Sequence, residues 1–331
     1  ILRFNKENMN ILQKEVNVSA GSNIVLNTVL EISGVTQTIT VEEKAPEIDT
    51  GSSSIDVTIK SDEQQKLPSG ASFVGLLTKA PGIRSEPVGG GIMSDGASRA
   101  ENDFYVNGVK MSDTESGSLR VTAAFPHEFM EETQVQRSSD ARFGGSLGSA
   151  VNGILKRGEN EFHGQIWSYV NHNGLNASPN QVLQLSLLDD NIAEYRQIKK
   201  DPSYAVAPGY IMGSSIVKNK IYFLSGSRPS FGLTERSVTF LKNNLPGNFS
   251  SRTRQDFTLN KVDLDLSFLG RPLQMYFAHV YSPLRVRGFL PSQEGNSSPD
   301  TLWQQRGYRV PASLVLWKGA YFPTDKLSVS A

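Results

Sequence analysis

A stretch rich in glycine and serine divides this chain into two different kinds of sequence. Residues 143–164 read FGGSLGSAVNGILKRGENEFHG, and small residues dominate their first half. Glycine permits unusual backbone angles and close backbone approach, so this half predicts tightly packed turns and extended chain. Residues 151–156 form a short apolar segment, and the aromatic-rich residues 165–171 are typical of a strand. We therefore expect a small mixed domain before this stretch and long strands after it.

The second half of the chain carries the pattern of an antiparallel sheet with two different faces. Residues 261–268 alternate between polar and apolar side chains, and residues 326–331 repeat the pattern. A period of two places the apolar side chains on one face. Candidate short turns lie at 218–219, 269–272 and 322–325, and long polar stretches lie at about 172–206, 229–252 and 284–309. Short turns that alternate with long loops are typical of outer-membrane barrels.

The composition excludes several classes of protein. The chain has 33 basic and 33 acidic residues, so its charge does not favour nucleic acid as a partner. It has no cysteine, which excludes disulfides and cysteine-based metal sites. It also lacks a run of about 18 apolar residues, which a transmembrane helix would need. A hydrophobic share of 38% suits strands that face lipid on one side only.

The first half predicts short elements. Segments 16–18 and 24–32 read as two strands that cannot form a core of their own. Residues 71–80 predict a short helix that a Pro-Gly pair ends, and residues 103–109 predict a hairpin with an Asn-Gly turn. Residues 125–132 begin with a helical turn that leads into a further strand.

Motifs for catalysis or metal binding lack the context that their chemistry needs. Residues 144–148 match the nucleophile elbow G-x-S-x-G, but a strand-like segment follows where a helix is required. Residues 127–131 lack the second histidine of a zincin. Side chains that could chelate calcium are Asp95, Asn102, Asp103, Asp113 and Glu115, but their spacing is not that of an EF-hand, and solvated loops explain them better. We therefore predict no catalytic residue, no metal ligand and no cofactor.

The junction at residues 141–164 resembles the plug-to-barrel junction of TonB-dependent outer-membrane transporters. Its pattern is Ala-x-Phe-Gly-Gly-Ser-x-Gly-Ser-x-Val-Asn-Gly-x-x-Lys-x-Gly-x-Asn-Glu-Phe-His-Gly, which is most similar to the Oar-like branch with an N-terminal carboxypeptidase-regulatory-like domain. The resemblance implies a mixed fold: the end of that β-sandwich at 1–34, a TonB-box region and linker at 35–60, a small α+β plug domain at 61–160, and the first six to seven strands of an antiparallel transmembrane β-barrel at 161–331. Because family barrels have about 22 strands, we expect an incomplete barrel.

The resemblance also implies a function, a location and partners. It implies TonB-dependent active transport across the bacterial outer membrane, with a plug that gates the barrel when a TonB-type energy-transducing protein pulls. The TonB box would be Thr38, Ile39, Thr40 and Val41. Outer-membrane lipid would surround the barrel, and the transported ligand would be an oligosaccharide, a peptide or a metal chelate. An outer-surface adhesin or glycan-binding β-protein without transport is the alternative.

Charged residues are candidates for contacts between plug and barrel lumen. They are Arg84, Arg99, Arg137, Arg142, Lys156 and Arg157 on the plug, and Asp263 and Asp265 on the strands. Surface charge on a soluble domain is the alternative explanation. The alternation directs Asp263 and Asp265 to the lumen and Leu264 to lipid. We therefore expect Leu264→Arg to impair assembly and Asp263→Arg to be tolerated far better.

Overall fold

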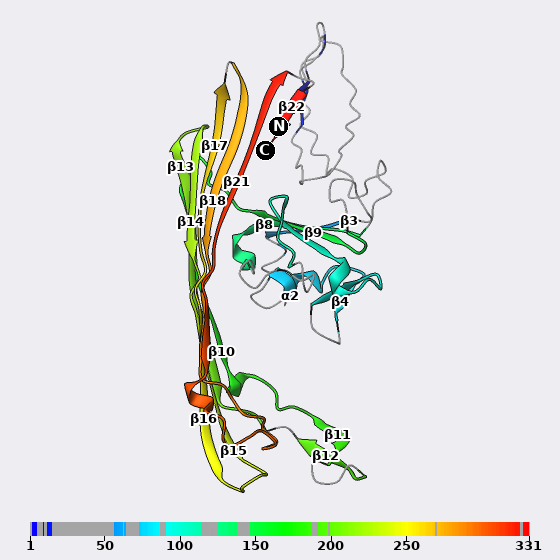
Figure 1. Ribbon diagram of the computed structural model, residues 1–331. Coiled ribbons are helices and arrows are strands. Elements are labelled where there is room, and N and C mark those ends of the chain that lie inside the picture. The colour runs from blue at the N-terminus through cyan, green and yellow to red at the C-terminus, as the bar shows by residue number, and fades with distance from the viewer. Residues whose placement is uncertain are drawn as a thin grey trace.

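Figure 1 shows a small body beside one face of a long, strongly twisted β-sheet. The structure is a computed structural model that describes residues 2–4, 9, 12–14, 56–61, 63, 73–86, 91–113, 119, 125–137, 146–186, 191–197, 199–268, 270–324 and 327–330. Near the start, β1 (Leu2–Phe4) pairs with β2 (Leu12–Lys14). The strands predicted at 16–18 and 24–32, and the proposed box at 38–41, lie outside the described residues.

The small body is built on a five-stranded sheet, hereafter the small sheet, in the order β3-β8-β9-β6-β7. Its strands are β3 (Asp56–Lys60), β6 (Asp103–Val106), β7 (Val109–Lys110), β8 (Met130–Gln136) and β9 (Ala150–Leu155). The body is completed by α2 (Phe73–Leu77), β4 (Ile83–Ser85), β5 (Ile92–Ser94) and the 3-10 turns η1 (Arg99–Glu101) and η3 (His127–Phe129). Because β3 pairs with β8, the small sheet begins at Asp56, inside the stretch 35–60 that the sequence assigned to a linker.

Glycine fixes both predicted turns of the small body. Asn107 and Gly108 have φ values of 49° and 80°, so the Asn-Gly hairpin between β6 and β7 forms as predicted. Gly82 follows α2 with a φ of 78°, and a Cβ atom there would lie 2.5 Å from Asp95 Oδ1. Asp95 itself accepts hydrogen bonds from the guanidinium of Arg137. The helix predicted at 71–80 is shorter in the structure and ends at Leu77, and the glycine of the Pro-Gly pair that follows leaves room for an ion pair.

We expect Gly82→Ala to destabilise the small body by about 1–3 kcal/mol, since an L-residue is strained at this φ. Gly96 is a matched control because its φ is 90° and no atom lies within 4 Å of a Cβ built there. Gly96→Ala therefore reports backbone strain alone, and the larger loss for Gly82→Ala reports the collision with the ion pair. Thermal unfolding measures both variants, and equal losses would contradict the role of the ion pair.

Asn102 ties the glycine- and serine-rich stretch to the small body. Its side chain is buried, and Nδ2 donates to the carbonyls of Ile92 and Ser98, both at 3.0 Å. Its Oδ1 accepts from the Ser149 backbone N–H at 2.9 Å and from the Ser149 hydroxyl at 3.0 Å. A Cβ atom at Gly148 would lie 2.5 Å from that Oδ1, so the small residues serve close packing.

Asp95 and Asp103, two carboxylates of the possible calcium set, have protein partners, and Glu115 lies outside the described residues. Asp103 pairs with Lys110 at 2.7 Å and accepts from the Ser112 hydroxyl at 3.1 Å. Among the described residues no group of three or more acidic or histidine side chains could hold a metal ion. The calcium alternative is therefore not supported there.

The long sheet has eleven strands in the order β20-β19-β16-β15-β13-β14-β17-β18-β21-β22, with β10 paired to β13. They are β10 (His163–His172), β13 (Ser203–Val217), β14 (Ile221–Ser227), β15 (Ser230–Thr239), β16 (Pro246–Gln255), β17 (Thr258–Phe268), β18 (Arg271–Tyr281), β19 (Leu284–Arg287), β20 (Gly307–Val310), β21 (Ser313–Thr324) and β22 (Leu327–Ser330). The chain is thus mostly β-sheet with few helices, as predicted.

Eight of these strands join end to end into four long strands. Each join is two residues long, at 228–229, 256–257, 282–283 and 311–312. Register is kept across the joins, because Ser227 pairs with Thr258 on one side and Ser230 with Gln255 on the other. The Arg228 N–H still donates to the Phe257 carbonyl at 2.7 Å. Side chains therefore keep alternating between the two faces along the whole length of each long strand.

The two ends of the long sheet differ in their connections. Turns at 218–220 and around residue 270 join the strands at one end. At the other end, residues 173–202 carry the hairpin of β11 (Gln181–Leu185) and β12 (Ala193–Gln197), and residues 288–306 form a second long connection. Among the described residues, no helix has the length and apolar character needed to cross a membrane.

The prediction of a long polar loop at 229–252 is wrong. β15 and β16 pair from Ser230–Gln255 to Thr239–Pro246, and only residues 240–245 connect them. Polar residues such as Ser237 and Asn248 lie in these strands and hydrogen-bond across them at 2.7 Å. The polar sequence at 229–252 therefore belongs to strands that extend past the apolar part of the sheet, and not to a loop.

Candidate functional site: the contact between the small body and the long sheet

Phe129 is the centre of the contact between the small body and the long sheet. Its ring is fully buried and lies 4.9 Å from the Phe257 ring and 6.1 Å from the Trp167 ring. A Cβ atom at Gly226 would lie 2.6 Å from Phe129 Cε1, so the glycine leaves the hollow that the ring fills. The Phe129 side chain, hereafter the Phe129 wedge, therefore inserts from η3 into the long sheet.

The wedge is part of one apolar core that both bodies share. Phe125 meets Phe257 edge to face at 5.4 Å. Leu259 and Val280 of the long sheet are buried in the same cluster as Met130 of the small sheet. At about 25 cal/mol per Å² of apolar surface, such a contact contributes several kcal/mol to holding the two bodies together.

Alternation along β17 separates a face covered by the small body from an opposite face. Lys261 is 4% exposed and Asp263 is 8% exposed, whereas Leu266 on the opposite face is 37% exposed. Lys261 Nζ donates to both carboxylate oxygens of Asp263, at 2.7 and 2.9 Å, and lies 5.4 Å from the Tyr276 ring centre. A second cation at position 263 would therefore be buried beside Lys261, which contradicts the premise that Asp263→Arg is well tolerated.

The chain crosses from the small body to the long sheet at a second charged contact. Arg157 Nη2 donates to Asp265 at 2.7 Å, and its guanidinium lies 4.7 Å from the Tyr222 ring centre. A Cβ atom at Gly158 would lie 2.3 Å from the Phe223 carbonyl oxygen, so the backbone presses directly on the sheet there. The structure thus brings Arg157 and Asp265 of the predicted charged set together.

The other predicted charged residues are placed differently. Arg137 pairs with Asp95 within the small body, and the Arg99 backbone N–H donates to Glu86 at 3.0 Å. Lys156 is half-buried, and this burial lowers the pKa of its ammonium, against the opposing effect of Glu131 and Glu128. Arg142 and the box residues Thr38, Ile39, Thr40 and Val41 lie outside the described residues.

A third polar contact surrounds Glu128, which the sequence explained only as a helix-start carboxylate. Glu128 is 4% exposed; its Oε2 lies 3.6 Å from Arg228 Nη1 of the long sheet and its Oε1 lies 3.8 Å from His127 Nε2. The His127 ring is 6.3 Å from the Tyr169 ring. Burial lowers the pKa of the His127 imidazole below its ordinary value of 6.5, although Glu128 acts in the opposite direction.

This pKa shift predicts that acid weakens the contact. A histidine whose folded pKa is lowered binds fewer protons folded than unfolded, so its stabilisation is present above about pH 6.5 and is lost as the pH falls below that value. We expect the unfolding temperature to fall on acidification, and to fall less in His127→Gln. Melting curves from pH 8 to pH 5 measure this, and parallel pH profiles for both proteins would contradict the prediction.

The structure thus holds a small mixed body on one face of a long antiparallel sheet, and the sequence that joins them resembles the plug-to-barrel junction of TonB-dependent transporters. The chain is 25% identical over 271 residues to the TonB-dependent transporter Oar of Myxococcus xanthus. The match covers 78% of this chain and 24% of Oar, so the chain spans about a quarter of that relative. No family model matches the chain.

The solved structures that this chain resembles include an outer membrane transporter and siderophore receptors, by their descriptions. The outer membrane transporter YddB of Escherichia coli is 10% identical, with 80% of this chain and 53% of YddB covered and a TM-score of 0.34. The siderophore receptor PirA of Acinetobacter baumannii is 14% identical, with 82% and 55% covered and a TM-score of 0.33.

The relationship to Oar confirms the resemblance that the junction motif indicates. The chain is similar to a TonB-dependent transporter, and its similarity to Oar agrees with the predicted resemblance to the Oar-like branch. Oar is a transporter by its description.

Proposed function

We propose that the small body is the plug, and the long sheet part of the barrel wall, of a TonB-dependent transporter that moves a ligand actively across the outer membrane. One observation carries the proposal: the long sheet has two different faces. The Phe129 wedge and the Lys261–Asp263 pair lie under the small body, while Val262, Leu264 and Leu266 occupy the opposite face. A lipid-facing wall around a plugged lumen needs this division.

The proposed organisation follows the predicted domains with one change. Residues 1–34 would end a carboxypeptidase-regulatory-like β-sandwich, and residues 35–55 would hold the TonB box and linker. The plug would run from Asp56, where β3 begins, to about residue 160, and the wall would begin at residue 161. The wall would be incomplete in this chain, and outer-membrane lipid would cover its apolar face.

The edge position of β3 suggests how force would enter the plug. The proposed box precedes β3, and the first pair that a pull would load is Asp56 with Gln136. β3 runs antiparallel to β8, so a pull on its N-terminal end loads the pairs in succession toward Lys60 and Glu132. The TonB-type partner would therefore peel β3 away before it loads the Phe129 wedge at the far end of β8.

An experiment on Ile39 in the full-length protein tests energised transport. Proline removes a backbone donor and fixes φ, so Ile39→Pro should prevent strand addition to the partner and abolish uptake, while Ile39→Val should change little. Surface binding should stay intact in both variants. Uptake and equilibrium binding of candidate oligosaccharides, peptides and metal chelates would be measured side by side in cells.

The same experiment separates transport from the alternative. Normal uptake by the Ile39→Pro variant would remove the box from residues 38–41. Binding without any energised uptake, in the unmodified protein as well, would favour an outer-surface adhesin or glycan-binding protein. The experiment identifies the transported ligand as the compound whose uptake depends on Ile39.

A further inference from the structure

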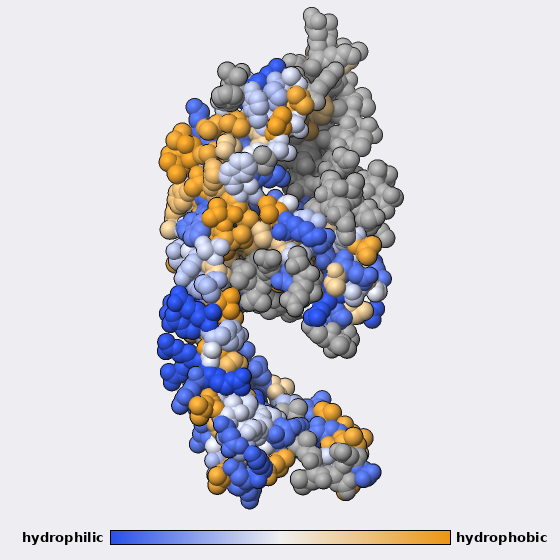
Figure 2. Space-filling model, viewed as in Figure 1, coloured by the Kyte–Doolittle hydropathy of each residue, from blue (hydrophilic) through white to orange (hydrophobic). Residues whose placement is uncertain are grey.

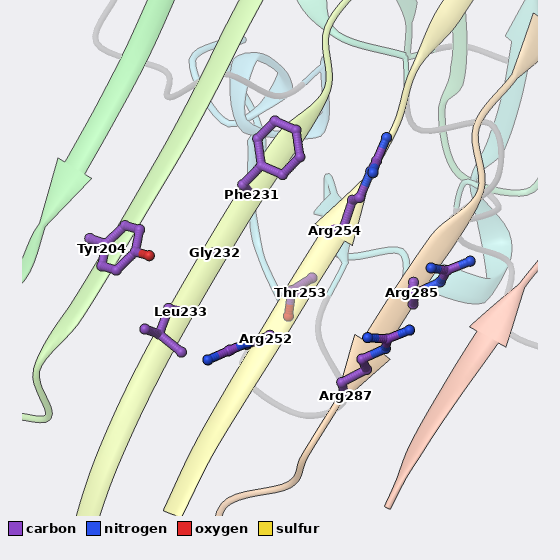
Figure 3. A pocket seen from close by; sticks show the side chains of 9 residues that line it. All are labelled: Tyr204, Phe231, Gly232, Leu233, Arg252, Thr253, Arg254, Arg285 and Arg287. Atoms are coloured by element: carbon purple, nitrogen blue, oxygen red, sulfur yellow. The ribbon is translucent and has the colours of Figure 1, made fainter.

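Five arginines gather on one face of the long sheet. In one row across the sheet, Phe231 pairs with Arg254, Arg254 with Arg285, and Arg285 with Arg309. In the next row, Leu233 pairs with Arg252, and Arg252 with Arg287. Paired residues in a sheet point to the same face, so these five side chains, hereafter the arginine cluster, form one patch. Figure 3 shows four of them beside Phe231 and Leu233.

The arginine cluster lies on the face that points away from the small body. Because alternation continues across the join at 256–257, Arg252 and Arg254 share a face with Val262 and Leu264, opposite the buried Phe257. The cluster lies toward the end with the long connections, and all five arginines are exposed. Figure 2 shows hydrophobic residues over the part of the long sheet near the short turns and more hydrophilic residues beyond them.

The spacing along the strand places the cluster at one edge of the apolar band. From Leu266 to Arg254 the chain advances twelve residues, about 40 Å at 3.3 Å per residue. At the strand tilt of barrels, about 35–45°, this corresponds to roughly 30 Å along the membrane normal, just beyond an apolar band of about 25 Å. The guanidinium groups would therefore lie at the level of the headgroups of the outer leaflet.

Among the residues that the structure describes, only Arg254 of the arginine cluster has an acidic partner. Arg254 pairs with Asp256 at 3.0 Å and lies 5.3 Å from the Phe231 ring centre. Within the part of the chain that the structure describes, no carboxylate lies within ion-pair distance of the other four arginines. Like charges that face each other across strands destabilise a sheet, so an anion that binds between the rows would relieve the repulsion. Guanidinium forks match phosphate oxygens in pairs.

A shallow cavity accompanies the charge. It has a volume of about 520 Å³, and apolar side chains line one side while arginines line the other. Its lining includes Tyr204, Phe231, Leu233, Arg252, Arg285 and Arg287. A ligand that suits both sides carries phosphate next to apolar chains, which is the chemistry of a phosphorylated membrane lipid.

We propose that the arginine cluster binds the phosphorylated headgroup of a lipid in the outer leaflet of the outer membrane. The inference rests on the proposed position of the long sheet in the barrel wall. The rows formed by Arg254–Arg285 and Arg252–Arg287 hold the phosphates, and Tyr204, Phe231 and Leu233 contact the adjoining apolar part. The bound lipid fixes the height of the barrel in the membrane on this side.

The test compares two charge-matched variants of the full-length protein, purified in detergent. One is Arg252→Gln with Arg287→Gln; the control is Lys218→Gln with Lys220→Gln, which removes two exposed charges at the opposite end of the sheet. The probes are lipid A with its phosphates, dephosphorylated lipid A and inorganic phosphate. We expect the arginine variant to bind phosphorylated lipid A at least tenfold more weakly, and the lysine variant to bind it normally.

Three results would overturn the inference. They are equal binding by both variants, equal binding of dephosphorylated lipid A, and displacement of the lipid by inorganic phosphate at the same concentration. The first leaves the cluster without a role, the second reduces the site to an apolar contact, and the third makes free phosphate the ligand. Outer-membrane fractionation and a heat-modifiable band on a gel check the barrel separately, so failure of the proposed function is distinguishable from failure of the lipid site.

Discussion

Replacing Phe129 with alanine should loosen the small body from the long sheet. The ring is fully buried against Phe257 and Trp167, and the hollow that it fills exists because residue 226 is glycine. Truncation of a buried phenylalanine costs about 3–5 kcal/mol, and the upper part of this range applies where the surroundings cannot close the cavity. Strand backbone forms the floor at Gly226, so little relaxation is available there.

Limited proteolysis and thermal unfolding of the full-length protein measure this effect. We expect the Phe129→Ala variant to be cut within the small body at protease concentrations that leave the unmodified protein intact. Leu147→Ala is the control, because it also truncates a large apolar side chain but at a position that is 83% exposed. Equal protease resistance of the two variants would show that the wedge does not hold the small body.

The features that the sequence predicted well are those that depend on neighbours along the chain. The Asn-Gly hairpin follows from two residues that tolerate positive φ, and both Asn107 and Gly108 have it. The alternation at 261–268 correctly separates Lys261 and Asp263 from Leu266, because a strand has a period of two whatever covers its faces.

The features that the sequence did not reveal depend on partners far apart in the chain. Phe129 meets Phe257, which is 128 residues further along the chain, and Glu128 meets Arg228, which is 100 residues further along. Neither pair has a sequence signature, because the residues next to Phe129 and Glu128 in the sequence do not indicate whether these side chains are exposed or which distant residue they contact. The loop predicted at 229–252 failed for a related reason: hydropathy reports the surroundings of a segment and not its backbone pairing, and polar residues such as Ser237 and Asn248 lie in paired strands there.

At Asp263 the predicted face of the strand is correct, but the predicted effect of a mutation is not. The alternation directs its side chain to the inner side, and an inner side filled with water would tolerate a change of charge. In the structure the small body covers this position, and Asp263 is the direct partner of the buried Lys261. The effect of a mutation at position 263 depends on what packs over that position, and the alternation of a single strand does not contain this information.

We therefore expect Asp263→Arg to impair assembly about as strongly as Leu264→Arg. Loss of one partner of a buried ion pair costs about 3–5 kcal/mol, and the new guanidinium adds a like charge beside Lys261. Leu264→Arg places a cation on the proposed lipid face, at a cost of about 2–4 kcal/mol near the midplane. The fraction of full-length protein that forms a heat-modifiable band in outer-membrane fractions measures both.

A double variant decides whether the ion pair is the cause. Lys261→Met with Asp263→Leu removes both charges and keeps similar volumes, and replacing a buried pair by packed apolar side chains is often neutral or stabilising. We expect this double variant to assemble far better than Asp263→Arg. If Asp263→Arg assembled normally, position 263 would face water rather than the small body; if the double variant failed as badly as the single one, the shape of the site and not its charge would control assembly.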